Sequence, residues 1–332
     1  MIDSKKLRSQ LAGTGFLLGW LFFSLAFLGQ SDICQAEADA AVLYTSPSVT
    51  TPQLPFFAAR AAGRLDSVFK LKIEYWKDPE SLQTLVLAGK GDLWIGHIEG
   101  FARARAKGAP VTLVAVTGWR KFYLLSSRLD VLTPEALSGK NLPYTPAGSP
   151  SVPVLRAILG QSADKVNFSA EEPKQLAMKL LAGTYDTALV PEPIVSSILA
   201  KNPALKVIWS LEDEFAERFG GNPRLPLAGI AVNTNYLSSH PAAVERLLSG
   251  MKAGAEDLKT RPENACEVMP AEFSEFVPCQ MLQASLKRDI IQVEKASEVQ
   301  AEIMRYISLV APELSAGSLG AGFFWQAGQN VK

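Results

Sequence analysis

Short apolar runs alternate with amphipathic stretches along residues 41–310, and the alternation predicts strands and helices in turn. Helical patterns follow the apolar runs, and one of them opens with Thr51-Pro52, where a proline in the first turn after a Thr is a helix start signal. Strands that alternate with helices of 10–15 residues predict an α/β protein with largely parallel sheets. The runs that have the length of buried strands lie at 43–45, 93–96, 111–116, 142–145, 187–190, 205–209 and 228–233.

The pattern repeats within the chain. The segments LAGKGD at 87–92 and LAGTYD at 181–186 share four of six residues, at an offset of 181 − 87 = 94. The register then continues without a gap through a strand, a loop, a helix ending in Ala-Lys and a further strand. Six letters can match by chance, but the gapless register favours duplication or a common architecture. We therefore expect two α/β lobes built in the same way.

The chain runs on well beyond the second copy, which ends near Leu211. One strand and three helical stretches, at 239–258, 275–290 and 297–310, make a poor third domain. We therefore expect the chain to return to the first lobe, with crossings near residues 123–128 and 223–227. Two crossings between lobes predict a hinge beside a cleft. The resulting domains are lobe one at 39–126 plus 226–332, and lobe two at 127–225.

The first residues have the layout of an export signal. Lys5, Lys6 and Arg8 precede an uncharged apolar stretch at 11–28, and small-residue cleavage sites follow at 36–38 and 38–40. We expect residues 1–38 to be a signal peptide that is cleaved near Ala38. The alternative is an uncleaved membrane anchor, because about eighteen apolar residues are just enough to span a bilayer.

Three cysteines occur in the chain, and Cys34 lies within the predicted signal and outside any lipobox. Cleavage leaves Cys266 and Cys279 in a compartment that permits disulfides, so we expect these two to be bridged. Two separately buried thiols are the alternative.

The charge balance narrows the class of partner. The chain has 33 Lys and Arg residues against 33 Asp and Glu residues, with no basic run. The sequence therefore predicts no positively charged surface of the kind that binds nucleic acid or an anionic membrane. His97 and His240 are the only histidines, and neither CxxC nor HExxH spacing occurs, so we expect no metal. Since GxSxG, Walker A and post-strand GxGxxG motifs are also missing, we expect the protein to have no enzymatic activity and no cofactor. We also expect it to be a monomer.

Several segments, taken in order, resemble those of the substrate-binding proteins of ABC importers. Within that class the chain looks like the nitrate/sulfonate/taurine and thiamine-precursor (NMT1/THI5-like) group, over nearly all of residues 41–310. The resemblance implies a two-lobed periplasmic-binding-protein fold of type II, with two mixed or parallel sheets, a hinge and an interlobe cleft. The segments that carry it are PFFAARAAG at 55–63, LAGKGDLWIG at 87–96, ARAKGAP at 104–110, residues 183–193 and LSSHP at 237–241.

The resemblance also implies a function. A protein of this group is exported, captures a small molecule in the cleft and delivers it to an ABC permease and its ATPase. A periplasmic sensor module for a membrane signalling protein is the alternative. An enzyme of the thiamine-precursor type fits less well, because the cysteine-rich cluster of that relative has no counterpart here. The chain has His97, Ile98 and Glu99 where the group usually has small residues, so the ligand does not transfer from the family.

The ligand site follows from sheet geometry. In open α/β sheets, ligands bind outside the carboxyl ends of the strands, where helix N-termini point outward. The repeat register pairs the loop 97–99 with the loop 191–193, and we expect these loops to face one another across the cleft. An aromatic side chain, a histidine and two loop acids favour an organic anion or a polar heterocycle as ligand. The candidate ligand-binding residues are Ser46, Ser48, Thr51, His97, Ile98, Glu99, Trp119, Gly148, Ser149, Ser151, Pro191 and Glu192.

Each candidate also has a structural role as its alternative. Small hydroxyl residues at helix starts often serve only as caps. Loop carboxylates are often merely solvated, and a tryptophan after a buried strand is often packed in the core.

Overall fold

The computed structural model describes residues 39–47, 50–66, 68–270, 278–314, 316–320 and 322–326. These residues belong to one compact unit. The predicted signal peptide, its cleavage site, Cys34 and the candidate residue Ser48 lie outside the described residues. Within the described part of the chain, no helix is long and apolar enough to cross a membrane.

The first sheet has the strand order β11-β4-β10-β3-β1-β2. Strand β1 runs parallel to both β2 and β3, whereas β10 runs antiparallel to its neighbours β3 and β4. The sheet is therefore mixed, because β10 near its centre and the short edge strand β11 run opposite to the other strands. Its strands are β1 (Asp39–Thr45), β2 (Phe69–Tyr75), β3 (Leu93–His97), β4 (Val111–Gly118), β10 (Ala228–Asn233) and β11 (Glu294–Lys295).

The second sheet has the order β7-β6-β8-β5-β9 and repeats the plan of the first. Strand β6 runs parallel to β7 and β8, and β5 is the reversed strand between β8 and β9. Strands β3 and β8 start at residues 93 and 187, which reproduces the offset of 94 found in the sequence. The strands are β5 (Phe122–Ser126), β6 (Asn141–Tyr144), β7 (Asn167–Ala170), β8 (Thr187–Pro191) and β9 (Lys206–Ser210).

The chain passes between the sheets earlier than the sequence predicts. Residues 122–126, which overlap the expected crossing at 123–128, form strand β5 inside the second sheet. All five side chains of this strand are buried, so it belongs to the core and not to a linker. The first crossing is therefore residues 119–121, and the second lies just before β10. The two crossings hydrogen-bond to each other, since Leu225 N donates to Trp119 O at 2.8 Å and Leu227 N to Gly118 O at 3.0 Å.

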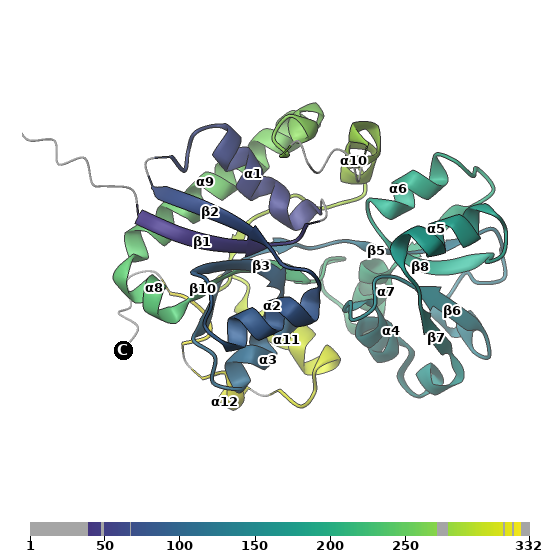
Figure 1. Ribbon diagram of the computed structural model, residues 1–332. Helices are drawn as coiled ribbons and strands as arrows, with labels where there is room; N and C mark the ends of the chain where they lie inside the picture. The colour runs from purple at the N-terminus through teal and green to yellow at the C-terminus, as the bar shows by residue number, and fades with distance from the viewer. Residues whose placement is uncertain are drawn as a thin grey trace, which may run out of the picture. The chain divides into compact units, whose positions relative to one another are not determined.

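Helices cover both faces of the six-stranded sheet. Helices α1 (Leu54–Ala61) and α9 (Pro241–Thr260) lie on one face, and α2 (Pro79–Leu87), α3 (Ile98–Ala106) and α11 (Gln300–Val310) lie on the other (Figure 1). The alternation of side chains along a strand explains this arrangement. In β3, Leu93 and Ile95 pack on the α1–α9 side, whereas Trp94 packs on the opposite side.

The five-stranded sheet is covered in the same way. Helices α5 (Pro173–Leu181) and α6 (Ile194–Leu199) pack on Tyr123 and Leu125, and α4 (Ser151–Leu159) and α7 (Leu211–Phe219) pack on the face of Leu124. The hydrophobic core under α4 and α7 is continuous with the core between the first sheet and helices α2 and α3. Helix α11 packs on α4. The remaining helices are α8 (Thr234–Ser239), α10 (Cys279–Leu286) and α12 (Ala316–Leu319), with short 3₁₀ turns at η1 (Thr51–Gln53), η2 (Pro134–Leu137), η3 (Gly160–Lys165) and η4 (Pro262–Cys266).

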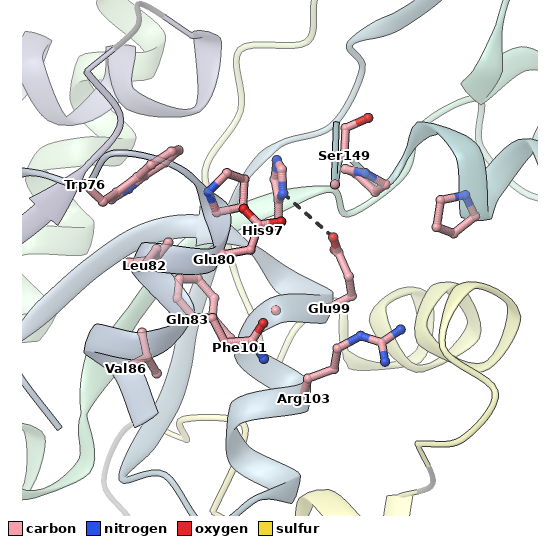
Figure 2. Close-up of a pocket in the computed structure, with 15 residues that line it drawn as sticks. Trp76, Glu80, Leu82, Gln83, Val86, His97, Glu99, Phe101, Arg103 and Ser149 are labelled. Carbon is pink, nitrogen blue, oxygen red and sulfur yellow. Dashed lines mark ion pairs between the residues drawn. The ribbon is translucent and has the colours of Figure 1, made fainter. Parts of the chain in front are cut away.

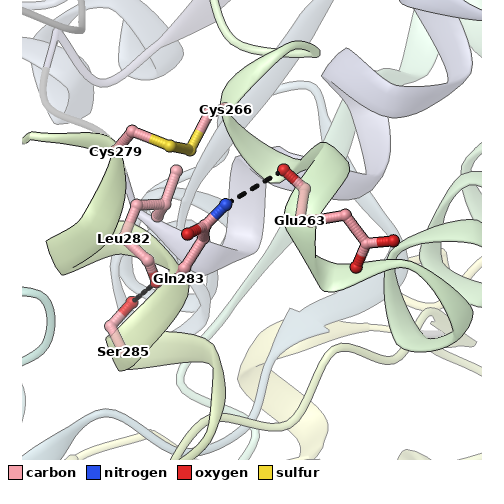
Figure 3. Close-up of a disulfide and its surroundings, with 6 residues drawn as sticks. All are labelled: Glu263, Cys266, Cys279, Leu282, Gln283 and Ser285. Atoms are coloured by element: carbon pink, nitrogen blue, oxygen red, sulfur yellow. Dashed lines mark hydrogen bonds between the residues drawn. A yellow bond between two sulfur atoms is a disulfide. The ribbon is translucent and has the colours of Figure 1, made fainter.

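The predicted disulfide is present. Cys266 at the end of η4 is bonded to Cys279 at the start of α10, across a Cα separation of 5.4 Å (Figure 3). A hydrogen bond of 3.2 Å from Gln283 Nε2 to Glu263 O ties the same two elements together. The disulfide therefore anchors α10 to the end of the long helix α9.

Replacing both Cys266 and Cys279 by serine is expected to lower the free energy of unfolding by about 2 to 3 kcal/mol, because the unfolded chain regains the entropy of a closed loop. Urea unfolding of the exported protein measures this loss. Wild-type protein kept reduced should match the double variant, and an unchanged unfolding free energy in both would contradict a stabilising bridge.

Candidate functional site

A pocket of about 180 Å³ opens at the carboxyl ends of the strands, between parts of both sheets. One wall comes from the residues after β2, from α2 and from the first turns of α3. The opposite wall is the loop 148–150 together with the first turn of α4 (Figure 2). Four of the candidate residues line it: His97, Glu99, Gly148 and Ser149.

His97 and Glu99 reach the pocket because β3 ends at the start of α3. His97 has extended backbone angles and is the N-cap residue, and Glu99 lies in the first helical turn, where a carboxylate is favoured by the helix dipole. Glu99 Oε2 accepts a hydrogen bond of 3.0 Å from Tyr306 Oη. Its Oε1 lies 3.8 Å from His97 Nδ1, the contact that is dashed in Figure 2.

Burial shifts both of these groups toward their neutral forms. It raises the pKa of Glu99 to about 7. Burial, together with the charge of Lys121, lowers the pKa of His97 to about 3. The imidazole is therefore neutral at pH 7, and its contact with Glu99 is not a pairing of opposite charges.

The opposite wall depends on a glycine. Gly148 has a φ of +70°, and a Cβ at this position would lie 2.9 Å from Glu80 Oε1 of α2. The absence of a side chain thus lets the loop approach α2 closely. Ser149 and Ser151 are buried beside it, with their hydroxyl oxygens 2.7 Å apart. Ser149 borders the pocket, whereas Ser151 is fully buried behind it in α4.

Trp76 lines the pocket together with a second aromatic residue, Phe101, and is not among the residues predicted from the sequence. Its indole Nε1 donates to Ile95 O at 3.3 Å, which orients the ring beside the pocket. The signal was present, because residues 69–75 alternate strictly between apolar and charged types and so predict a strand. Trp76 follows that strand at its carboxyl end, where ligand-contacting residues are expected.

Two candidates lie in the core instead. Ile98 is completely buried, and its backbone N donates to Leu227 O at 3.2 Å. Trp119 is also completely buried; its Nε1 donates to Gln292 O at 3.1 Å, and the guanidinium of Arg224 lies 4.2 Å from the ring centroid. Trp119 is therefore a packed residue of the crossing and not an aromatic wall of the pocket.

The loop after β1 is closed by Gln53. This buried side chain donates to Thr45 Oγ1 and to Ser46 O, each at 2.8 Å, and accepts from Thr50 N at 3.0 Å. The Thr51 hydroxyl donates to Asp289, whose pKa is raised to about 7 by burial. Ser46 and Thr51 are both buried, and neither lines the pocket.

Glu192 has partners within the protein. Its side chain is 1% exposed and accepts from Arg288 Nε at 2.7 Å, from Ser196 N at 3.0 Å and from Ser196 Oγ at 3.1 Å. Pro191 is buried at the end of β8. His97 shares its pocket with Gly148 and Ser149, whereas Pro191 and Glu192 do not line it. That loop 97–99 faces loop 191–193 stays a prediction.

A further buried carboxylate, that of Glu212, lies at the first crossing. Glu212 Oε1 accepts from Lys121 N at 2.9 Å, and burial raises the pKa of this carboxyl to about 7. Burial lowers the pKa of Lys121 to about 8. A hydrogen bond to Glu212 of α7, which packs on the second sheet, therefore fixes the backbone of the first crossing.

Comparison with known proteins supports this fold. The chain resembles the periplasmic aliphatic sulphonate-binding protein SsuA from Escherichia coli, with 14% identity and a TM-score of 0.69 over 87% of this chain and 98% of that one. It is also similar to the alkanesulfonate-binding protein SsuA from Xanthomonas axonopodis pv. citri bound to MOPS, with 16% identity and a TM-score of 0.65 over 88% and 100% of the two chains. An ABC transporter from Parabacteroides distasonis gives 16% identity and a TM-score of 0.66, over 87% and 99%.

These likenesses and the two mixed sheets confirm the predicted fold class, the α/β fold of periplasmic binding proteins. No curated protein sequence matches the chain. A family model described as NMT1/THI5 like matches residues 66–265, which is more than half of the chain. The chain therefore belongs to the NMT1/THI5-like family.

Proposed function

We propose that this protein is the exported solute-binding component of an ABC importer. The main observation behind the proposal is the pocket at the carboxyl ends of strands from both sheets. It lies beside the two segments that connect the sheets, which are hydrogen-bonded to each other. Membership of the NMT1/THI5-like family and a fold shared with periplasmic binding proteins of ABC transporters support it.

The two sheets form the cores of two lobes in this proposal. Lobe one comprises residues 39–118 and 226–332, and lobe two comprises residues 122–225, with the crossings as hinge. A ligand that touches His97 and Glu99 from one lobe and Gly148 and Ser149 from the other gains its full contacts only when the lobes are close together. Binding then stabilises the closed form, which is the form that the permease recognises.

The proposed location is the periplasm. The basic n-region, apolar stretch and small-residue cleavage sites of the first 40 residues support export and release. A disulfide between Cys266 and Cys279 is in keeping with an oxidising compartment. The partners are a small molecule, an ABC permease and its ATPase, and the protein acts as a monomer.

A thermal-shift screen against organic anions, amines and thiamine precursors tests this function. A ligand present at 100 times its Kd stabilises the folded state by about 2.7 kcal/mol, which raises the melting temperature measurably. Small-angle scattering of the saturated protein should then show compaction.

A pocket-blocking variant locates the binding. Gly100 lines the pocket, and a Cβ at this position meets no atom within 4 Å. Gly100→Trp is therefore expected to fill the pocket and abolish the shift, whereas Gly100→Ala and the exposed Lys201→Ala keep it. A ligand that binds Gly100→Trp as tightly as wild type would exclude this pocket as its site.

A further inference from the structure

The pocket lining has more acidic than basic side chains. Its ionisable lining residues are Glu80, His97, Glu99 and Arg103. Arg103 is paired with Glu313 in the segment after α11, and His97 is neutral at pH 7. The charge of Arg103 also acts on Glu99, so the lining carries two carboxylates, Glu80 and Glu99, against one guanidinium that is shared with Glu313.

The surroundings of Glu99 emphasise this imbalance. Its carboxylate is 13% exposed, and its partner Tyr306 contributes a hydroxyl and no charge. Lys121 and His97 line a separate cavity of about 10 Å³, and the charge of Lys121 acts on His97 and Asp289. Removing a carboxylate from water is costly, and this desolvation outweighs the charge of Arg103 and raises the pKa of Glu99. A positively charged ligand would remove that cost.

Glu80 lies at the junction between the two walls. It projects from α2, and its Oε1 lies where Gly148 of the opposite loop leaves room for it. Glu99 contacts His97, and Glu80 lines the same pocket (Figure 2). A cation at this point would contact carboxylates from two different helices of lobe one.

The rest of the lining suits the body of an organic cation. Trp76 offers an aromatic surface, and aromatic faces attract cations through their quadrupole. Leu82, Val86 and Phe101 add apolar walls. A cavity of about 150 Å³ holds a benzene ring, so a pocket of about 180 Å³ has room for one ring with a small substituent.

We propose that this pocket binds a small organic cation, an ammonium compound or a protonated heterocycle, whose charge lies between Glu80 and Glu99 and whose apolar part packs on Trp76. The inference rests on the proposed solute-binding function and specifies its ligand class. A sulfonate in the same place would meet two carboxylates, and like charges brought together in an interface oppose binding. The ligand class therefore differs from that named for the SsuA proteins.

A charge series on one molecular frame tests the proposal. Benzylammonium, benzyl alcohol and phenylmethanesulfonate share a ring and differ in charge, and choline with its neutral isostere 3,3-dimethylbutan-1-ol forms a second series. Calorimetry at pH 7.5 should show that the cations bind at least tenfold more tightly than the neutral compounds and that the sulfonate does not bind.

Variants locate the recognition. Glu99→Gln keeps an acceptor for Tyr306, and Glu80→Gln changes an exposed residue, so both should fold as wild type. Each is expected to weaken cation binding about tenfold or more, because a charge-assisted contact is lost. Glu80→Lys should abolish cation binding. Glu256→Gln, on the exposed side of α9, is the matched control and should bind the cations like wild type.

Three results would overturn the proposal: preference for the sulfonate, cation binding that is unchanged in both Glu99→Gln and Glu80→Gln, or no binding by any cation. A ligand found in the wider screen that Gly100→Trp blocks would still support the solute-binding function in each of these cases. The failure of the ligand class is thereby distinguished from the failure of the function.

Discussion

Gly229→Ala is expected to lower the free energy of unfolding by about 3 kcal/mol or more, the upper end of the usual cost of overpacking a core. Gly229 lies in β10, an antiparallel strand near the centre of the first sheet, and every residue of β10 is buried. A Cβ at this position would lie 2.3 Å from the backbone oxygen of Ala115 in β4. Because that atom is backbone within a paired strand, it cannot move aside as a flexible side chain would.

The same substitution at Gly100 is the matched control. Gly100 is helical, and its added methyl group meets nothing within 4 Å. Gly100→Ala should therefore stabilise the protein by about 0.5 to 1 kcal/mol, because alanine loses less backbone entropy than glycine in a helix. Urea unfolding at pH 7 measures both variants. Equal effects at the two positions would show that the contact with Ala115 is relieved at little cost.

The position of Gly229 also bears on the hinge. The pairing of β10 with β4 shifts register on both sides of residues 229–230. Next to this irregularity, Ala228 pairs with His97 on one side and with Gly118 on the other. The irregularity therefore lies where the pocket meets the crossings, and a folded Gly229→Ala protein should show altered ligand affinity.

The alternation of apolar runs and helices predicted the fold class, because strands that are buried on both faces need continuous apolar residues. The repeat register located the ends of β3 and β8, which are equivalent in the two sheets. The sequence predicts a crossing near residues 123–128, whereas residues 122–126 form strand β5. Its topological equivalent is β10, which lies a hundred residues later, so no local register could reveal it.

The same reasoning found part of the pocket. The rule that ligands bind at the carboxyl ends of strands selected His97, Glu99, Gly148 and Ser149, because it depends only on where strands end. The rule did not select Trp76, because the strand that precedes it, β2, was not predicted. It also could not foresee that Trp119 is packed or that Glu192 has an ion-pair partner, since those facts depend on contacts distant in sequence.

The ion pair between Glu192 and Arg288 provides the second large effect. Glu192 is buried in the second sheet's β8–α6 connection, and Arg288 follows α10. Arg288 also donates from Nη2 to Ser196 Oγ at 2.6 Å, and its backbone O accepts from Tyr123 Oη. The pair therefore attaches the segment after α10 to the second sheet, beside the crossings.

Arg288→Met is expected to lower the free energy of unfolding by about 3 kcal/mol, because it leaves the Glu192 carboxylate buried without a cation. Arg128→Met, which breaks half-exposed pairs with Asp130 and Asp186, is the control and should leave the free energy of unfolding nearly unchanged. Urea unfolding at pH 7 compares the two variants.

A second substitution separates a buried charge from lost packing. Adding Glu192→Gln to Arg288→Met removes the unpaired charge and keeps a side-chain oxygen for Ser196 N. The double variant should therefore be more stable than Arg288→Met alone, by about 1 to 2 kcal/mol, since much of the cost of breaking a buried pair is the charge left behind. If Glu192→Gln destabilises both backgrounds equally, the two side chains do not interact, and the segment after α10 is held to the second sheet by its other contacts.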